Sequence, residues 1–210
     1  MWTTIFTAIG VILLGILYYF DLLFNKAITR EVFDQCMVIY REWQGDIDHV
    51  GKVFGEISSD LKPKLTSSKS PAFGIYFDDP KSLINKAQAR CSIGYILITE
   101  EQKKDAQEIA STSNNKYKIA SVPKAMTLSL EYKYRNMFSI LLLGYFWRKI
   151  MAQFYSEGMK RKNDTSFVEV YDLREGRQST IRLHYPLENI ETFLITSVKK
   201  PESLDLKSKF

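Results

Sequence analysis

The sequence predicts an α+β domain built from a duplicated strand-helix-strand-strand unit and preceded by one transmembrane helix. Three features predict it: an uncharged apolar run at the start, two passes of the same order of segments, and a charged, then Ser/Asn-rich stretch between them. With 210 residues and 45% apolar content, the chain is long enough for one domain with a core and an anchor. We expect an anchor at 3–24, a domain at 26–190 with halves at about 31–98 and 117–186, and a short flexible tail at 191–210.

The anchor prediction rests on residues 3–20, which carry no charge, and on the apolar residues that continue the run past Asp21. Roughly 20 such residues are what a helix needs to cross about 30 Å of hydrocarbon. Trp2 at one end and Tyr19 at the other suit the two membrane interfaces. A cleaved signal peptide is the alternative, but a basic first segment and a small-residue cleavage site are both missing. The pattern therefore favours a signal-anchor.

The orientation of the anchor follows from the basic residues beside it. No Lys or Arg precedes the run, whereas Lys26 and Arg30 follow it. The positive-inside tendency places these two in the cytosol and the short N-terminus in the lumen or outside. Asn163 begins an Asn-x-Thr glycosylation sequon, which should stay unmodified if the domain is cytosolic.

The first half of the domain is predicted to contain a strand, a helix and two more strands. Apolar residues at helical spacing indicate the helix, which ends before Pro63. The four segments are 32–40, 47–61, 73–77 and 89–98. The stretch 99–116 is typical of a linker between halves, with room for one short helix.

The second half repeats this order. Asn136 is a plausible N-cap for a helix from Met137 to about Gly158. The strands are predicted at 118–122, 127–134, 167–171 and 179–185. The run 137–147 is apolar enough to suggest a second membrane span, but it is about 11 residues long and bounded by arginines, so we expect a buried core helix.

Composition argues against several classes of function. The net charge of +5 comes from scattered residues without a recognition motif, so no nucleic-acid partner is expected. His49 and His184 are the only histidines, and we predict neither a metal nor another cofactor. Cys36 and Cys91 sit in apolar runs and are expected to be buried reduced thiols. Neither a Ser-His-Asp set nor a phosphate loop occurs, which predicts that the protein is not an enzyme.

Two stretches of the first half carry a resemblance to known proteins. The turn Tyr76-Phe77-Asp78-Asp79-Pro80, followed by Arg90-Cys91-Ser92-Ile93-Gly94, resembles the GyrI-like domain. More narrowly, it is similar to the testis-expressed protein 264 family of endoplasmic-reticulum proteins. The second half, through 118–123 and 167–171, follows the same order, so the resemblance covers essentially the whole chain.

The resemblance implies a duplicated fold with a concave groove between its halves. It also implies a protein of the endoplasmic-reticulum membrane, with a luminal N-terminus and a cytosolic domain, that acts as an adaptor or receptor in selective autophagy of that organelle (reticulophagy). The implied partners are the ubiquitin-like autophagy modifiers and the valosin-containing AAA ATPase.

The chain departs from that family at its tail. The autophagy receptors carry a long acidic tail with an aromatic-x-x-aliphatic motif that adds as a strand to the modifier. Here the tail is short and holds no such motif in an acidic setting. The bare pattern fits Phe54–Ile57, on a predicted helix, and Phe167–Val170, in a predicted strand.

The alternative function is a small-molecule binding module tethered to a membrane, and its candidate site is Glu169. Strand alternation puts Phe167, Glu169 and Tyr171 on one face. GyrI-like drug-binding proteins, which the chain resembles, use such a glutamate to hold flat cations. We expect a raised pKa for Glu169 if no cation is near. Further ligand-binding candidates are Tyr40, Trp43 and Tyr132.

Two other roles for Glu169 stay open at the level of sequence. Arg182 or His184, on the adjacent predicted strand, could pair with the carboxylate and make it structural. A weak hydrolase is the other possibility, because some GyrI-like proteins appear to use a glutamate and a tyrosine on small electrophiles. Glu169 and Tyr171 supply those residue types.

Overall fold

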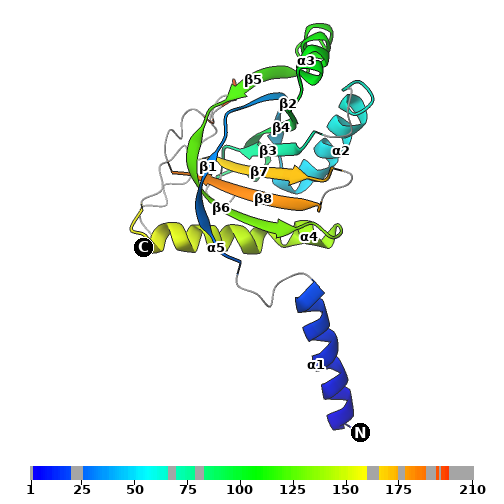
Figure 1. Ribbon diagram of the computed structural model, residues 1–210, viewed down its shortest axis with the longest axis vertical. Helices are drawn as coiled ribbons and strands as arrows, with labels where there is room; N and C mark the ends of the chain where they lie inside the picture. Colours follow the sequence, from blue (N-terminus) through cyan, green and yellow to red (C-terminus); the bar gives the residue numbers. More distant parts are fainter. Residues whose placement is uncertain are drawn as a thin grey trace.

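The computed structural model describes residues 2–19, 26–65, 70–78, 83–159, 166–174, 178–187, 193 and 195–198. It consists of an N-terminal helix that stands apart from an α+β domain, and the domain is a curled sheet with helices packed against it (Figure 1). The sequon at Asn163, the end of the expected anchor and the last residues of the expected tail lie outside the described residues.

The elements follow the predicted order closely. The helices are α1 (Trp2–Tyr19), α2 (Val50–Leu61), α3 (Glu100–Thr112), α4 (Phe138–Leu141) and α5 (Leu143–Ser156), with short 3-10 turns at Ile47–His49 and Lys86–Gln88. The strands are β1 (Thr29–Phe33), β2 (Cys36–Gly45), β3 (Ala72–Tyr76), β4 (Ala89–Leu97), β5 (Lys118–Val122), β6 (Ala125–Lys133), β7 (Phe167–Asp172) and β8 (Thr180–Pro186).

All strand pairs in the sheet are antiparallel, and their order is β1-β6-β8-β7-β3-β4-β2-β5. The first half supplies β2-α2-β3-β4 and the second supplies β6-α5-β7-β8, and the halves meet where β3 pairs with β7. The predicted duplicated α+β architecture is therefore confirmed. The remaining strands are exchanged: β1 precedes the first half but pairs with β6, and β5 precedes the second half but pairs with β2.

This exchange explains one wrong boundary. The stretch 32–40 was expected to form one strand, but the chain leaves β1 at Phe33 and starts β2 at Cys36. Because β1 and β2 pair with strands of different halves, the chain has to break between them.

Two helices also differ from their predicted form. The linker holds a full helix, α3, whose first turn is closed by a capping box between Thr99 and Gln102. The helix expected from Met137 to Gly158 is divided at Leu142 into α4 and α5. Asn136 accepts a hydrogen bond from the Phe138 amide at 3.0 Å, as a capping side chain would, although Met137 occupies the N-cap position itself.

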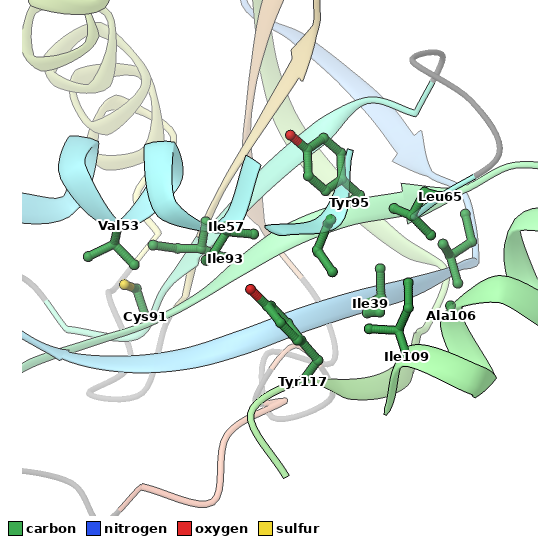
Figure 2. Packing of buried hydrophobic residues seen from close by; sticks show 12 residues of the cluster. Ile39, Val53, Ile57, Leu65, Cys91, Ile93, Tyr95, Ala106, Ile109 and Tyr117 are labelled. Carbon is green, nitrogen blue, oxygen red and sulfur yellow. The ribbon is translucent and has the colours of Figure 1, made fainter. Parts of the chain in front are cut away.

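The three long helices of the domain pack on one face of the sheet, in two clusters. In the first, Val53 and Ile57 of α2 lie over Cys91 and Ile93 of β4, and α3 closes the end (Figure 2). In the second, α5 places three side chains against β6 and β8: Phe146, Ile150 and Phe154. The halves join between these two clusters, where β3 pairs with β7.

The opposite face of the sheet is covered by the C-terminal segment. Phe193 is fully buried there in a third cluster. Ser92 donates to the Ile195 carbonyl, and Arg90 donates to that of Val198. The prediction of a flexible tail from residue 191 is therefore wrong for Phe193 and Ile195, because their side chains pack in this cluster.

Helix α1 is uncharged and its large apolar side chains are exposed, among them Phe6 at 67% and Val11 at 64%. In the part of the chain that the structure describes, no helix has both the length and the apolar character needed to cross a membrane.

The apolar run at 137–147 packs on the core with only one of its sides. Its inner side buries Ser139 and Phe146, but Met137, Phe138 and Leu141 are between 64% and 74% exposed. The expectation of a buried helix is wrong for these three, because the short α4 lies at the end of the sheet where only one of its sides has strands to pack on.

Candidate ligand site

Glu169 lies at the centre of the sheet, on the face that carries the helices. It stands on β7 opposite Gly74 of β3 on one side and Leu183 of β8 on the other. It therefore occupies the joint between the two halves of the sheet. Its side chain is buried, with an exposed fraction of 5%.

Three aromatic side chains donate hydrogen bonds to the Glu169 carboxylate. The indole Nε1 of Trp147 lies 2.8 Å from Oε1, and the Tyr171 hydroxyl lies 2.5 Å from Oε2. The Tyr76 hydroxyl also hydrogen-bonds this carboxylate. Because all three donors are neutral, they orient the carboxylate and stabilise its charge in part, without cancelling it.

Among the described residues, no basic side chain lies within ion-pair distance of Glu169. Arg182 pairs instead with Glu131, with Nε 2.9 Å from the carboxylate oxygen. His184 contacts the Thr127 hydroxyl at 3.1 Å. Register shows why: Leu183 is opposite Glu169, so its neighbours 182 and 184 point to the other face. Neutralisation by Arg182 or His184, as considered from sequence, is therefore wrong.

Burial raises the pKa of Glu169, and the hydrogen bonds from Trp147, Tyr171 and Tyr76 lower it only in part. This is the direction expected for a carboxylate that lacks a nearby cation. The phenol pKa values of Tyr76 and Tyr171 are raised well above the usual value by burial and by the charge of Glu169. Both phenols therefore keep their protons and act as donors.

More aromatic rings surround this group. The Phe54 ring of α2 meets the Tyr171 ring edge to face at 5.5 Å between centroids. The Phe167 ring meets that of Trp147 in the same manner at 4.9 Å. Phe54, Tyr76, Trp147, Phe167 and Tyr171 are all half-buried, so the aromatic side chains around the buried carboxylate are partly exposed.

The other predicted binding residues separate into three positions. Tyr132 of β6 lies on the same face as Glu169, its hydroxyl donates to the Ser139 carbonyl, and its pKa is raised by burial and then by the Glu169 charge. Trp43 also points to the helix face but packs against the first core cluster, one strand beyond Cys91. Tyr40 points to the opposite face and is buried in the cluster that holds Phe193.

Sequence reasoning missed Tyr76 and Trp147. A signal for Tyr76 existed: the face of β3 that carries it otherwise presents only Ala72 and Gly74. A Cβ at Gly74 would lie 3.1 Å from the Tyr76 ring, so the glycine leaves room for that ring beside Glu169. Nothing in the local sequence marks Trp147, because its hydrogen bond joins residues 22 positions apart.

Two other features of the domain have no part in the chemistry of this site. Burial raises the pKa of the Cys91 thiol, which makes it a poor nucleophile at neutral pH. A surface hollow of about 350 Å³ lies between the end of α2 and α3 and is lined by Lys64, Asp105, Glu108, Ile109 and Thr112. We place the candidate site at Glu169 rather than there, because the hollow holds no buried charged group.

The carboxylate of Glu169 and the aromatic rings around it are suited to binding a cation. A buried, oriented carboxylate attracts a cation, and aromatic faces around it attract the same charge through their quadrupoles. Within the described residues, no cluster of His, Cys, Asp and Glu could hold a metal ion. A flat or aromatic organic cation fits this chemistry better than a small hydrated ion.

Comparison with known proteins identifies the fold. The sequence matches no protein-family model, and no curated protein matches it. The crystal structure of the EcmrR C-terminal domain superposes with a TM-score of 0.51 at 10% identity, over 78% of this chain and 98% of that one. SAV2435 bound to tetraphenylphosphonium superposes at 0.50 with 8% identity, over 79% and 96% of the two chains. The Vibrio cholerae integron cassette protein VCH_CASS2 gives 0.51 at 12%, over 76% and 94%.

These structures share the curled antiparallel sheet with helices on it, which is the GyrI-like fold expected from sequence. At such low identity the likeness extends to the fold alone. Membership in the testis-expressed protein 264 family stays a prediction.

Proposed function

We propose that this domain binds an organic cation at Glu169, between the two halves of the sheet. The observation that carries the proposal is the buried carboxylate, which receives three neutral hydrogen bonds and has no basic partner among the described residues. A cation bound there would supply the missing countercharge. The fold supports this, because a protein of similar architecture has been solved with tetraphenylphosphonium, a cation of four aromatic rings.

The half-buried Trp147 controls access in this proposal. Its indole covers Oε1 of Glu169, so a ligand that reaches this oxygen has to displace the indole from its 2.8 Å hydrogen bond. The displaced ring would then be free to stack on the ligand, and the hydroxyls of Tyr76 and Tyr171 would keep the carboxylate in place.

The test is a titration of the full chain, in nonionic detergent, with tetraphenylphosphonium. Glu169→Gln keeps the shape of the side chain and removes its charge. We expect the affinity to fall at least about 30-fold, because a buried charge loses its partner. Glu131→Gln is the matched control: Glu131 is an exposed glutamate on the opposite face, and its loss should leave binding unchanged. Equal affinity for Glu169→Gln and the native chain would overturn the proposal.

We further propose that α1 attaches the domain to a membrane, as the expected anchor at 3–24 implies. The exposed apolar side chains of α1 support this, among them Phe6 at 67% and Val11 at 64%, because a bilayer would remove them from water. Alkaline carbonate extraction of membranes from cells that express the chain tests it: retention in the pellet is expected, and release into the supernatant would contradict it.

The endoplasmic-reticulum location and the autophagy role stay predictions, as do the named protein partners and the weak-hydrolase alternative. One geometric fact bears on the modifier motif. Phe167–Val170 lies in β7, which pairs with β3 and β8 on its two sides, so it has no free edge for another strand. Phe54–Ile57 lies within α2, and Ile57 is buried in the core.

A further inference from the structure

The exposed side of α4 forms an apolar patch on the surface of the domain. We define the α4 patch as Met137, Phe138, Leu141 and Tyr145, which are 69%, 64%, 74% and 39% exposed. Phe138, Leu141 and Tyr145 recur at spacings of three and four, so they share one side of the chain as it passes from α4 into α5. The buried residues Ser139 and Phe146 take the other side.

A contiguous apolar surface of this kind differs from a single exposed hydrophobic residue, which needs no explanation. The apolar side chains on the inner side of α5 are buried: Phe146, Ile150 and Phe154 fill the core between α5 and the sheet. The α4 patch is what remains, and it points away from the sheet at the end of the strands.

Positive charge surrounds the α4 patch. Residues 132–156 include Lys133, Arg135, Arg148 and Lys149 and contain neither Asp nor Glu. Arg135 and Arg148 are exposed. Acidic groups on elements that flank α4 and α5 are engaged in ion pairs: Asp172 pairs with Arg174, Glu131 with Arg182, and Glu157 with Arg30. The surface around the patch is therefore basic.

The α4 patch also lies next to the end of α1. The Arg135 guanidinium lies 5.0 Å from the centroid of the Tyr19 ring, at the last residue of that helix. Figure 1 shows this end of α1 on the side of the domain where α4 and α5 lie. Two apolar surfaces, one on the domain and one on α1, are thus brought to the same side of the molecule.

We propose that the α4 patch inserts into the surface of a lipid bilayer that carries anionic headgroups. Phe138, Leu141 and Met137 would reach the boundary between headgroups and acyl chains, while Arg135 and Arg148 would contact the headgroups. This deepens the membrane attachment proposed for α1: α1 brings the chain to the bilayer, and the patch fixes how the domain sits on it. Proposed ligand binding at Glu169 does not depend on it.

The test places a photoreactive residue on the patch. The full chain, with Phe138 replaced by p-benzoylphenylalanine, is reconstituted into vesicles of phosphatidylcholine and phosphatidylserine and irradiated, and lipid adducts are quantified by mass spectrometry. The same replacement at Ile84 is the matched control, because this residue is 60% exposed but lies at the opposite ends of the strands. Flotation of the vesicles reports in parallel whether the chain is attached at all.

We expect lipid adducts at position 138 and few at position 84. Arg135→Gln and Arg148→Gln should each lower the adduct yield up to about fivefold, because each basic residue near an anionic surface contributes about that factor. Replacing phosphatidylserine by phosphatidylcholine should lower the yield further, because it removes both contributions at once. A chain that floats with the vesicles but gives equal yields at 138 and 84, or crosslinks to a second copy of itself, overturns the patch proposal alone. A chain that does not float overturns the proposal for α1 as well.

Discussion

Asp78, two residues beyond the end of β3, and Glu169, on β7, are two buried carboxylates that have different partners. Asp78 receives two hydrogen bonds from the Arg90 guanidinium, at 2.9 Å each, and a third from the Arg90 amide at 2.8 Å. Glu169 receives its hydrogen bonds from two phenols and an indole. Their exposed fractions are nearly equal, 7% and 5%, so burial alone does not separate them.

The partners decide the role of each carboxylate. Asp78 is neutralised by a cation that also holds the C-terminal segment through the Val198 carbonyl, which makes it part of the architecture. The charge of Glu169 is left without a countercharge among the described residues, at the joint between two halves and below half-buried rings. This difference is the basis for the proposed ligand site at Glu169.

The largest expected difference between the two is in stability. Asp78→Asn should lower the free energy of unfolding by about 3–5 kcal/mol, because it leaves the buried Arg90 without its counterion. Glu169→Gln should change it by no more than about 1 kcal/mol, since an amide can accept from Trp147 and donate to a phenol. Urea unfolding of the full chain in detergent, followed by circular dichroism, measures both. A larger loss for Glu169→Gln than for Asp78→Asn would break the comparison.

The next effect concerns the indole over Glu169. Trp147→Phe keeps an aromatic ring and removes the N–H donor, and it should destabilise the chain by about 1.5–3 kcal/mol, the range for hydrogen bonds to charged groups. In a Glu169→Gln background the same change should cost about 1 kcal/mol, because the bond is then between neutral groups. The double-mutant cycle at neutral pH measures the difference. Equal costs in both backgrounds would mean that Glu169 is already protonated at that pH.

The smallest effect is a dependence on pH with a defined sign. The folded pKa of Glu169 is raised above its unfolded value, so the folded state holds this proton more strongly. Its contribution to stability is fully present below the ordinary carboxyl pKa, about 4.3, and is lost as pH rises through the folded pKa. The native chain should therefore lose stability relative to Glu169→Gln over this interval, while its affinity for tetraphenylphosphonium rises.

His184 titrates in the native chain and in Glu169→Gln alike, and its effect on stability has the opposite dependence on pH. It therefore cancels when the stabilities of the two proteins are subtracted. Burial, and then the charge of Arg182, lowers the pKa of His184 to about 3, so its contribution is lost as pH falls from about 6.5 toward that value. The neutral ring also means that its 3.7 Å contact with Glu31 is not an ion pair at neutral pH. If the free energy of unfolding of the native chain, relative to that of Glu169→Gln, stays level or rises with pH, the raised pKa of Glu169 is contradicted.

Local patterns of the sequence predicted much of this architecture. The alternation of Phe167, Glu169 and Tyr171 with two valines determined which face of β7 carries the carboxylate. Helical spacing before Pro63 located α2, and the repeated order of segments predicted the two halves. These predictions succeed because each depends on residues a few positions apart, where the geometry of a strand or a helix is fixed.

The tertiary structure alone decided which residues complete the site and what neutralises each acid. The exchange of β1 and β5 between halves, the burial of Phe193 and the hydrogen bond from Trp147 to Glu169 all join segments far apart in the chain. The arginine and histidine expected beside Glu169 face away from it because the pairing of β7 with β8 sets Leu183 opposite the glutamate. A shift of that register by one residue would have reversed the result, and only the packing of the whole sheet fixes it.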